Sequence, residues 1–134
     1  MGELVFNQEI SLPYVYTAGA VQRAALIGLR DGRLIGSTNG RYTAVPASPF
    51  APDGAHLRDT IVLDATGTLE AVTVAHHLPG APALGLIRVA GASQPVLHRL
   101  GDGAESLEPG ARVRAIWRED RSGSIDDILH FAPA

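Results

Sequence analysis

The side chains that could carry chemistry are spread thinly along this chain. Five histidines are present, and His76 and His77 form the one adjacent pair. Neighbouring residues on a strand point to opposite faces, so this pair is a poor chelate for one metal ion. His56, His98 and His130 lie far apart, with no carboxylate at a recognised metal-ligand spacing. No metal-binding residue is therefore predicted.

Nucleophilic and acid–base catalysis have no recognisable signature. The chain has no cysteine, and no serine lies in the Gly-x-Ser-x-Gly pattern of a nucleophile elbow. Asp126 and Asp127 are adjacent carboxylates, which we expect to be solvated turn charges, and no glycine-rich phosphate loop is present. No catalytic residue is predicted. An enzyme whose site is built from isolated polar residues stays as an alternative.

A basic strand face is the one feature with a plausible ligand. Arginines at 112, 114 and 118 alternate with apolar residues at 113, 115 and 117, which predicts a strand with one face inward and a mostly basic face outward. Guanidinium groups can fork onto phosphate or carboxylate oxygens. A solvated strand face is the alternative interpretation.

The elements that would position these residues change along the chain. Val21, Ala25, Leu26 and Leu29 recur at helical spacing and predict a helix from 17 to 30, with Thr17 as N-cap. Residues 34 to 58 are interrupted by glycine and proline, which predicts a loop-rich insert outside the core. Short strands separated by turn residues follow. We expect them at 60–63 continuing through a bend at Gly67 to 75, then at 84–90, 95–100, 112–119 and 124–131.

About five strands with a longer connection between the third and the fourth predict a mainly β fold. The expected architecture is a five-stranded Greek-key OB barrel preceded by the short helix. The expected division is residues 1–58 for the N-terminal segment and 59–134 for the barrel. At 134 residues the chain has the size of one domain with one main core.

Composition narrows the classes of function. The net charge is −3, which disfavours binding to a phosphate backbone, and no window approaches eighteen uninterrupted apolar residues. The first residues carry no basic and apolar leader, so a cytoplasmic location is expected.

Several segments together resemble one family, the acyl-CoA-associated OB-fold proteins of domain of unknown function thirty-five. Each motif is loose, but their order and spacing cover nearly the whole chain. The motifs are Leu12-Pro13-Tyr14 through Ala18-Gly19, the helix, the segments 31–36, 67–74 and 110–117, and the closing stretch 122–133.

Members of that family usually carry a rubredoxin-like zinc ribbon before the barrel, with four cysteine ligands. In this chain Gly36, Asn39, Phe50 and Asp53 stand at the four cysteine positions, while the glycines and proline of the two turns remain. The resemblance therefore implies a degenerate ribbon that binds no metal and needs packing or a partner's surface in place of the zinc cross-link.

The resemblance also implies a function. Such proteins accompany thiolase-like enzymes, among them steroid side-chain aldolases, so this chain is expected to be a non-catalytic accessory subunit of an acyl-CoA-processing complex. It would help to form the acyl-CoA site of a thiolase, retro-aldolase or acyltransferase and would hold no cofactor of its own. The alternatives are a partner of a hot-dog-fold enoyl-CoA hydratase and a single-stranded nucleic-acid-binding OB module.

These expectations assign residues to two sites, an acyl-CoA contact and a partner surface. Acyl-CoA phosphates, if they reach this chain, should meet Arg114 first and Arg112 next. The helix and the ribbon segment should expose an apolar surface that the enzyme partner, or a second copy of this chain in a homodimer, covers. The residues expected at this surface are Val21, Leu29, Ile35, Tyr42 and Phe50.

Overall fold

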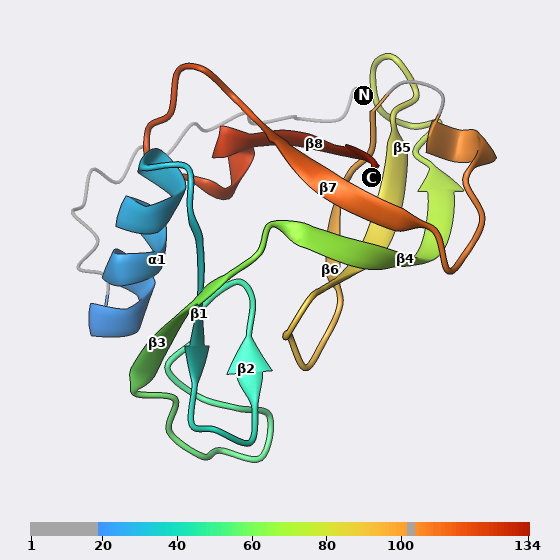
Figure 1. The fold of residues 1–134 in the computed structure, drawn as a ribbon. Helices are drawn as coiled ribbons and strands as arrows, with labels where there is room; N and C mark the ends of the chain where they lie inside the picture. Colours follow the sequence, from blue (N-terminus) through green and yellow to red (C-terminus); the bar gives the residue numbers. More distant parts are fainter. Residues whose placement is uncertain (1–18, 102–103) are drawn as a thin grey trace, which may run out of the picture.

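The computed structural model describes residues 19–101 and 104–134 (Figure 1). Within them, one α-helix, eight strands and two 3-10 turns follow one another along the chain. In order they are α1 (Ala20–Arg30), β1 (Leu34–Thr38), β2 (Thr43–Ala44), β3 (Asp59–Leu63), β4 (Thr66–Val74), β5 (Ala83–Val89), β6 (Val96–Arg99), η1 (Ala104–Ser106), β7 (Arg112–Trp117), η2 (Ile125–Asp127) and β8 (Ile128–Pro133). None of the helices in these residues has the length and apolar character needed to cross a bilayer.

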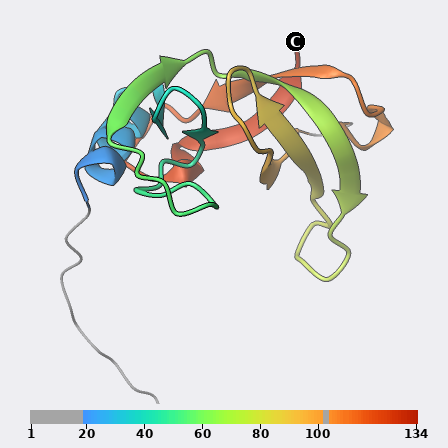
Figure 2. The ribbon, with the colours of Figure 1, turned by 90° about the horizontal axis from the view of Figure 1, so that it is seen from below.

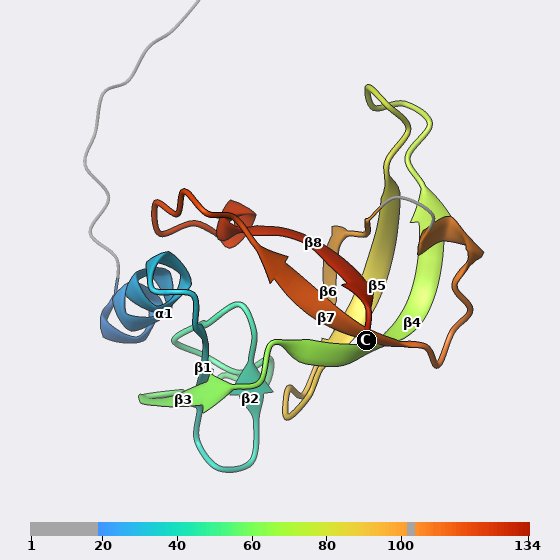
Figure 3. The ribbon, with the colours of Figure 1, turned by 45° about the horizontal axis from the view of Figure 1, so that its top comes forward.

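The larger sheet is antiparallel, with the strand order β6-β5-β4-β7-β8. Its two edge strands approach each other at a single parallel bridge between Leu100 and Phe131, next to a 2.9 Å hydrogen bond from the Gly101 N–H to the Phe131 carbonyl. The sheet curls around the core, as Figure 3 shows, but its ladder is not closed. The prediction of a mainly β fold with a preceding helix is confirmed. The five strands have the order expected of an OB fold, whereas the barrel is open at one seam rather than closed.

The smaller sheet has the order β2-β1-β3 and corrects two predictions. The strand expected to run from 60 to 75 is divided, because β3 pairs with β1 while β4 pairs with β5 and β7. Residues 34–58 were expected outside the core, but Leu34 and Val45 belong to the same buried cluster as the larger sheet. The glycines and prolines of this segment form its turns, but its apolar residues Leu34 and Val45 are still buried.

Alternating burial explains the strands of the larger sheet. β5 alternates buried and half-buried residues along its whole length, and β7 buries Val113 and Ala115 while Arg112 and Arg114 are exposed. The predicted orientation of the basic face is therefore confirmed. Trp117, which was expected to face inward, is only half-buried against the core, and the register of β7 with β8 shifts between Ile116 and Trp117.

Helix α1 covers the smaller sheet with one face. Val21, Ala25, Gly28 and Leu29 are its buried residues, which confirms three of the four apolar positions read from the sequence. The fourth, Leu26, is exposed. The N-cap is Gly19, whose N–H is bonded by the Gln22 side chain at 3.2 Å; the predicted N-cap, Thr17, lies outside the described residues. Figure 2 shows α1 and the smaller sheet at one end of the molecule and the β4–β5 hairpin at the other.

Candidate functional site

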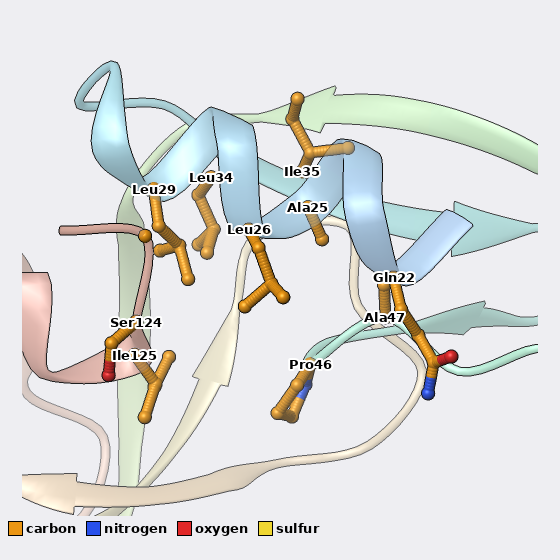
Figure 4. Close-up of a pocket in the computed structure, with 11 residues that line it drawn as sticks. Gln22, Ala25, Leu26, Leu29, Leu34, Ile35, Pro46, Ala47, Ser124 and Ile125 are labelled. Carbon is orange, nitrogen blue, oxygen red and sulfur yellow. The ribbon is translucent and has the colours of Figure 1, made fainter. Parts of the chain in front are cut away.

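An apolar groove runs beside helix α1 and has a volume of about 570 Å³ (Figure 4). Leu26 projects from the helix toward Pro46 and Ile125, and it is 41% exposed. We call this the helix groove. It is lined by Gln22, Ala25, Leu26, Leu29, Leu34, Ile35, Pro46, Ala47, Gly123, Ser124 and Ile125. A mostly apolar concavity of this size is typical of a surface that binds apolar chains or side chains.

Ser37 holds the wall of the helix groove formed by Pro46 and Ala47. Its side chain is fully buried in β1, and its hydroxyl donates to the Ser48 carbonyl at 2.6 Å and accepts from the Ser48 N–H at 2.9 Å. These two bonds fasten the segment after Pro46 to the smaller sheet. A buried hydroxyl is costly unless it is bonded in this way, so Ser37 is a positioning residue for this wall.

Asp127 holds the opposite wall, which Gly123, Ser124 and Ile125 form. Its carboxylate is 2% exposed and accepts the backbone N–H groups of Ser122, Gly123 and Ser124 at 2.8–3.0 Å. Burial raises the pKa of this carboxyl, but the three N–H donors and the charge of Arg121 outweigh it, so the net shift is downward. The expectation that Asp127 is a solvated turn charge is therefore wrong.

Arg121 joins this wall to the helix. Its Nε donates to the carbonyl of Arg30 at 2.9 Å, and its guanidinium also donates to the carbonyl of Arg118 at 2.8 Å. Arg30 is the last residue of α1, where carbonyl groups lack partners within the helix. One side chain thus caps α1 and holds the β7–β8 loop beside it.

A second, smaller groove lies beyond Pro46, which lines both grooves. Its volume is about 340 Å³, and we call it the ribbon groove. Phe50 is 50% exposed at its rim and packs against His56 with the ring centres 4.9 Å apart. The lining residues are Tyr42, Ala44, Val45, Pro46, Ser48, Phe50, Ala51, Pro52, Gln94 and Pro95.

The two grooves bring together most of the residues expected at a partner surface. Leu29 and Ile35 line the helix groove, and Tyr42 and Phe50 line the ribbon groove. Val21 lines neither of them and lies on the buried face of α1, so it is not part of an exposed surface. Whether a partner covers these residues stays a prediction.

The two arginines expected to meet acyl-CoA lie on the outer face of β7. Arg112 and Arg114 are exposed and pair in register with Thr68 and Thr66 of β4. Neither side chain makes an ion pair or hydrogen bond with the described residues, whereas the side chain of Arg88 on β5, the strand on the other side of β4, bonds Glu70 at 2.6 Å. Arg112 and Arg114 are therefore available to an anionic ligand, and neither lines a groove described above.

No set of titratable groups assembles in the helix groove. Its described lining contains neither a histidine nor a carboxylate, and the hydroxyl of Ser124 accepts the N–H of Asp126 at 3.2 Å. His76 and His77 lie in the exposed β4–β5 turn rather than on a strand. Across residues 19–101 and 104–134, no three histidine or carboxylate side chains lie close enough together to hold a metal ion.

The four degenerate ribbon positions do not fit a zinc ion. Gly36 has no room for a side chain, because a Cβ there would lie 2.8 Å from the carbonyl oxygen of Ala44. Asn39 accepts the N–H groups of Arg41 and Tyr42 at 2.9 and 2.8 Å, and Asp53 accepts that of Ala55 at 3.0 Å. These two side chains fold their own turns, so hydrogen bonds hold the ribbon turns here.

Sequence reasoning missed the residues that shape the grooves. Ser37, Pro46 and Gly123 were not singled out for the site, and Asp127 was assigned to solvent. A usable signal existed for Asp127, since Ser124 and Asp127 have the spacing of a capping box and form one around η2. The contact of Arg121 with Arg30 had no such signal, because it joins residues 91 positions apart.

Comparison with known proteins identifies similar folds. The chain is similar to a solved structure described as "Ltp2-ChsH2(DUF35) aldolase", with a TM-score of 0.64 and 19% identity over 89% of this chain and 98% of that one. It is also similar to a DUF35-family protein of unknown function from Sulfolobus solfataricus, with a TM-score of 0.63 and 15% identity over 87% of both chains. No family model and no curated protein sequence matches the chain. The similar structures are DUF35 proteins, in agreement with the resemblance read from the sequence.

Proposed function

We propose that this chain, which has the fold of DUF35 proteins, is a non-catalytic accessory subunit of a thiolase-like enzyme that acts on acyl-CoA. The observation that carries the proposal is the match over nearly the full length of both chains to the DUF35 chain of an aldolase assembly. The motifs from 31–36 to 122–133 support the same family independently of the fold.

The grooves supply a surface suited to an enzyme partner. Leu26 and Phe50 are large apolar side chains exposed by 41% and 50%, one in each groove, and Pro46 lines both. Exposed apolar surface rimmed by polar groups commonly marks an interface. The walls are held by Ser37, Asp127 and Arg121, so a partner would meet a preformed surface and lose little conformational entropy on binding.

The arginine face supplies a separate contact for the shared substrate. Arg114 and Arg112 are exposed and unpaired among the described residues, and guanidinium groups bind phosphate oxygens in a bidentate manner. We assign acyl-CoA phosphates to Arg114 first and Arg112 next. The partner enzyme would supply the groups that react.

Two substitutions in the assembled complex test this division of roles. Phe50→Asp should dissociate the complex by placing a charge in an apolar contact, while Arg114→Ala should raise the KM for acyl-CoA without dissociating it. Leu97→Asp is the matched control for Phe50→Asp, because Leu97 is 59% exposed on β6 and lines neither groove. Assembly that survives Phe50→Asp, with the fold intact by circular dichroism, would contradict the proposed interface.

A further inference from the structure

Strand β3 forms an open edge of the smaller sheet (Figure 1). It pairs with β1 over residues 59–63, and no other strand in the described part of the chain pairs with it. Four of its five residues are exposed, among them Ile61 at 39% and Val62 at 62%. An edge strand presents a row of N–H and C=O groups without partners, and an apolar one is a template for another strand.

Several of the usual protections of an edge strand are missing from β3, although its first residue, Asp59, is charged and exposed. The register with β1 is continuous over five residue pairs, so no bulge twists the edge away. No proline and no lysine lies between Asp59 and Leu63, and neither groove is lined by β3. A β-branched, exposed run of Thr60, Ile61 and Val62 is suited to pairing with an extended strand.

We propose that β3 pairs antiparallel with β3 of a second copy of this chain, across a two-fold axis at Ile61. The two smaller sheets would then become one continuous sheet, with the backbone groups of both edges satisfied. A two-fold interface of this kind uses the same surface on both copies, so a self-complementary strand is sufficient to form it.

The charges flanking β3 select this register. With Ile61 opposite its own copy, Thr60 faces Val62 of the second copy and Arg58 faces Asp64 of the second copy, twice by symmetry. In an antiparallel pair the outward N–H and C=O groups of the two strands must face each other. The two-fold axis can therefore pass through a residue but not between two residues, so the alternative registers have the axis at another residue. An axis at Thr60 would place Arg58 opposite Val62, and an axis at Val62 would place Asp64 opposite Thr60. The axis at Ile61 alone pairs the opposite charges.

Both charged side chains are free to make this contact. Arg58 and Asp64 are exposed, and neither forms an ion pair or hydrogen bond with the described residues. Opposite charges directly across an antiparallel pair are stabilising, whereas like charges are destabilising. No residue of β3 lines the helix groove or the ribbon groove, so this association uses a different surface from the one proposed for the enzyme partner.

Sedimentation of charge-reversed variants tests the pairing. The wild-type chain should dimerise with increasing concentration, and Arg58→Asp or Asp64→Arg alone should each raise the dimer dissociation constant about tenfold or more, because like charges then face each other at both ends. An equimolar mixture of the two variants should recover the association, since opposite charges face each other again. Arg23→Asp on α1 makes the same charge change at an exposed residue away from β3 and should have no effect.

Three results would overturn the proposal. They are a wild-type chain that stays monomeric at its highest soluble concentration, a dimer unaffected by both reversals, and a mixture that does not recover the association. Thermal melts of each variant identify any loss of folding, and Val62→Lys, which places a charge on the edge without touching Arg58 or Asp64, should also weaken the dimer. A monomeric chain whose enzyme binding is lost on both reversals would assign the edge to the other protein instead.

Discussion

At the scale of single residues, two buried polar side chains define the walls of the helix groove. Ser37 bonds both backbone groups of Ser48, and Asp127 bonds three successive N–H groups of the β7–β8 loop. In both cases the buried polar side chain supplies hydrogen-bond partners to backbone groups of a loop. Their substitution should therefore affect stability and groove shape together.

Ser37→Ala should lower the free energy of unfolding by about 1–3 kcal/mol, because the N–H and carbonyl of Ser48 lose their partner in a part-buried setting. Urea denaturation measures the change. Ser48→Ala is the control, since its hydroxyl bonds only the exposed backbone of Phe50, and it should cost less. Equal losses from the two substitutions would refute the role given to Ser37.

Asp127 should make the fold sensitive to acid. Since its pKa is lower in the folded chain than in the unfolded chain, its contribution is fully present above the unfolded pKa and is lost as the pH falls below about 4. Asp127→Asn should lower stability at neutral pH and flatten this acid dependence in urea titrations. The exposed neighbour supplies the control, Asp126→Asn, which should leave the acid dependence in place. An unchanged pH profile in Asp127→Asn would show that the carboxylate is not responsible.

The four degenerate ribbon positions should bind no zinc. Gly36 and Phe50 offer no ligand atom, and Asn39 and Asp53 are engaged with backbone N–H groups. Elemental analysis of the purified chain, dialysed against trace zinc, should find well under one zinc per chain. Stoichiometric zinc would mean that these four positions have been aligned incorrectly with the ribbon ligands.

At the scale of elements, a single arginine connects α1 with the β7–β8 loop. Arg121→Ala should remove the bond to the Arg30 carbonyl and cost about 1 kcal/mol, because the interaction is charge-assisted but exposed. Hydrogen exchange should rise in the last turn of α1 and in residues 118–127, whereas Arg23→Ala on the same helix should change neither. Unchanged exchange in both segments would mean that the loop is held by Asp127 alone.

The elements also show what could be predicted from sequence and what could not. The alternation of Arg112, Val113 and Arg114 has the two-residue period of a strand, so its orientation followed directly. The division between β3 and β4 did not follow, because both read as one run of strand residues and only the pairing of β3 with β1 separates them. The burial of Val45 was missed for a related reason, since glycine and proline around it signal turns but carry no information on long-range packing.

The candidate site was predictable only in part. The expected interface residues Leu29, Ile35, Tyr42 and Phe50 were chosen because they are apolar residues in a helix and a ribbon segment, and they line the two grooves. The wall of Gly123, Ser124 and Ile125 comes from the opposite end of the chain. It reaches the helix through tertiary contacts that no local pattern encodes, such as the bond from Arg121 to Arg30.

At the scale of the whole molecule, the two apolar grooves and the arginine face of β7 lie on different elements. The grooves and the arginine face offer contacts to a partner and to an anionic ligand, while the described lining of the helix groove brings no acid, base and nucleophile together. These are the two surfaces that the proposed accessory role uses. The edge of β3 adds a surface for a second copy at a place that neither groove uses.

The most direct test of the central claim is acyl-CoA turnover by this chain alone, by a thiolase-like enzyme that co-purifies with it, and by the two together. We expect no turnover by the chain alone and a higher kcat/KM for the complex than for the enzyme alone, with Phe50→Asp abolishing the gain and Leu97→Asp preserving it. Turnover by the isolated chain at a rate comparable with that of the complex would contradict the account, as would an enzyme whose activity and assembly are indifferent to the chain.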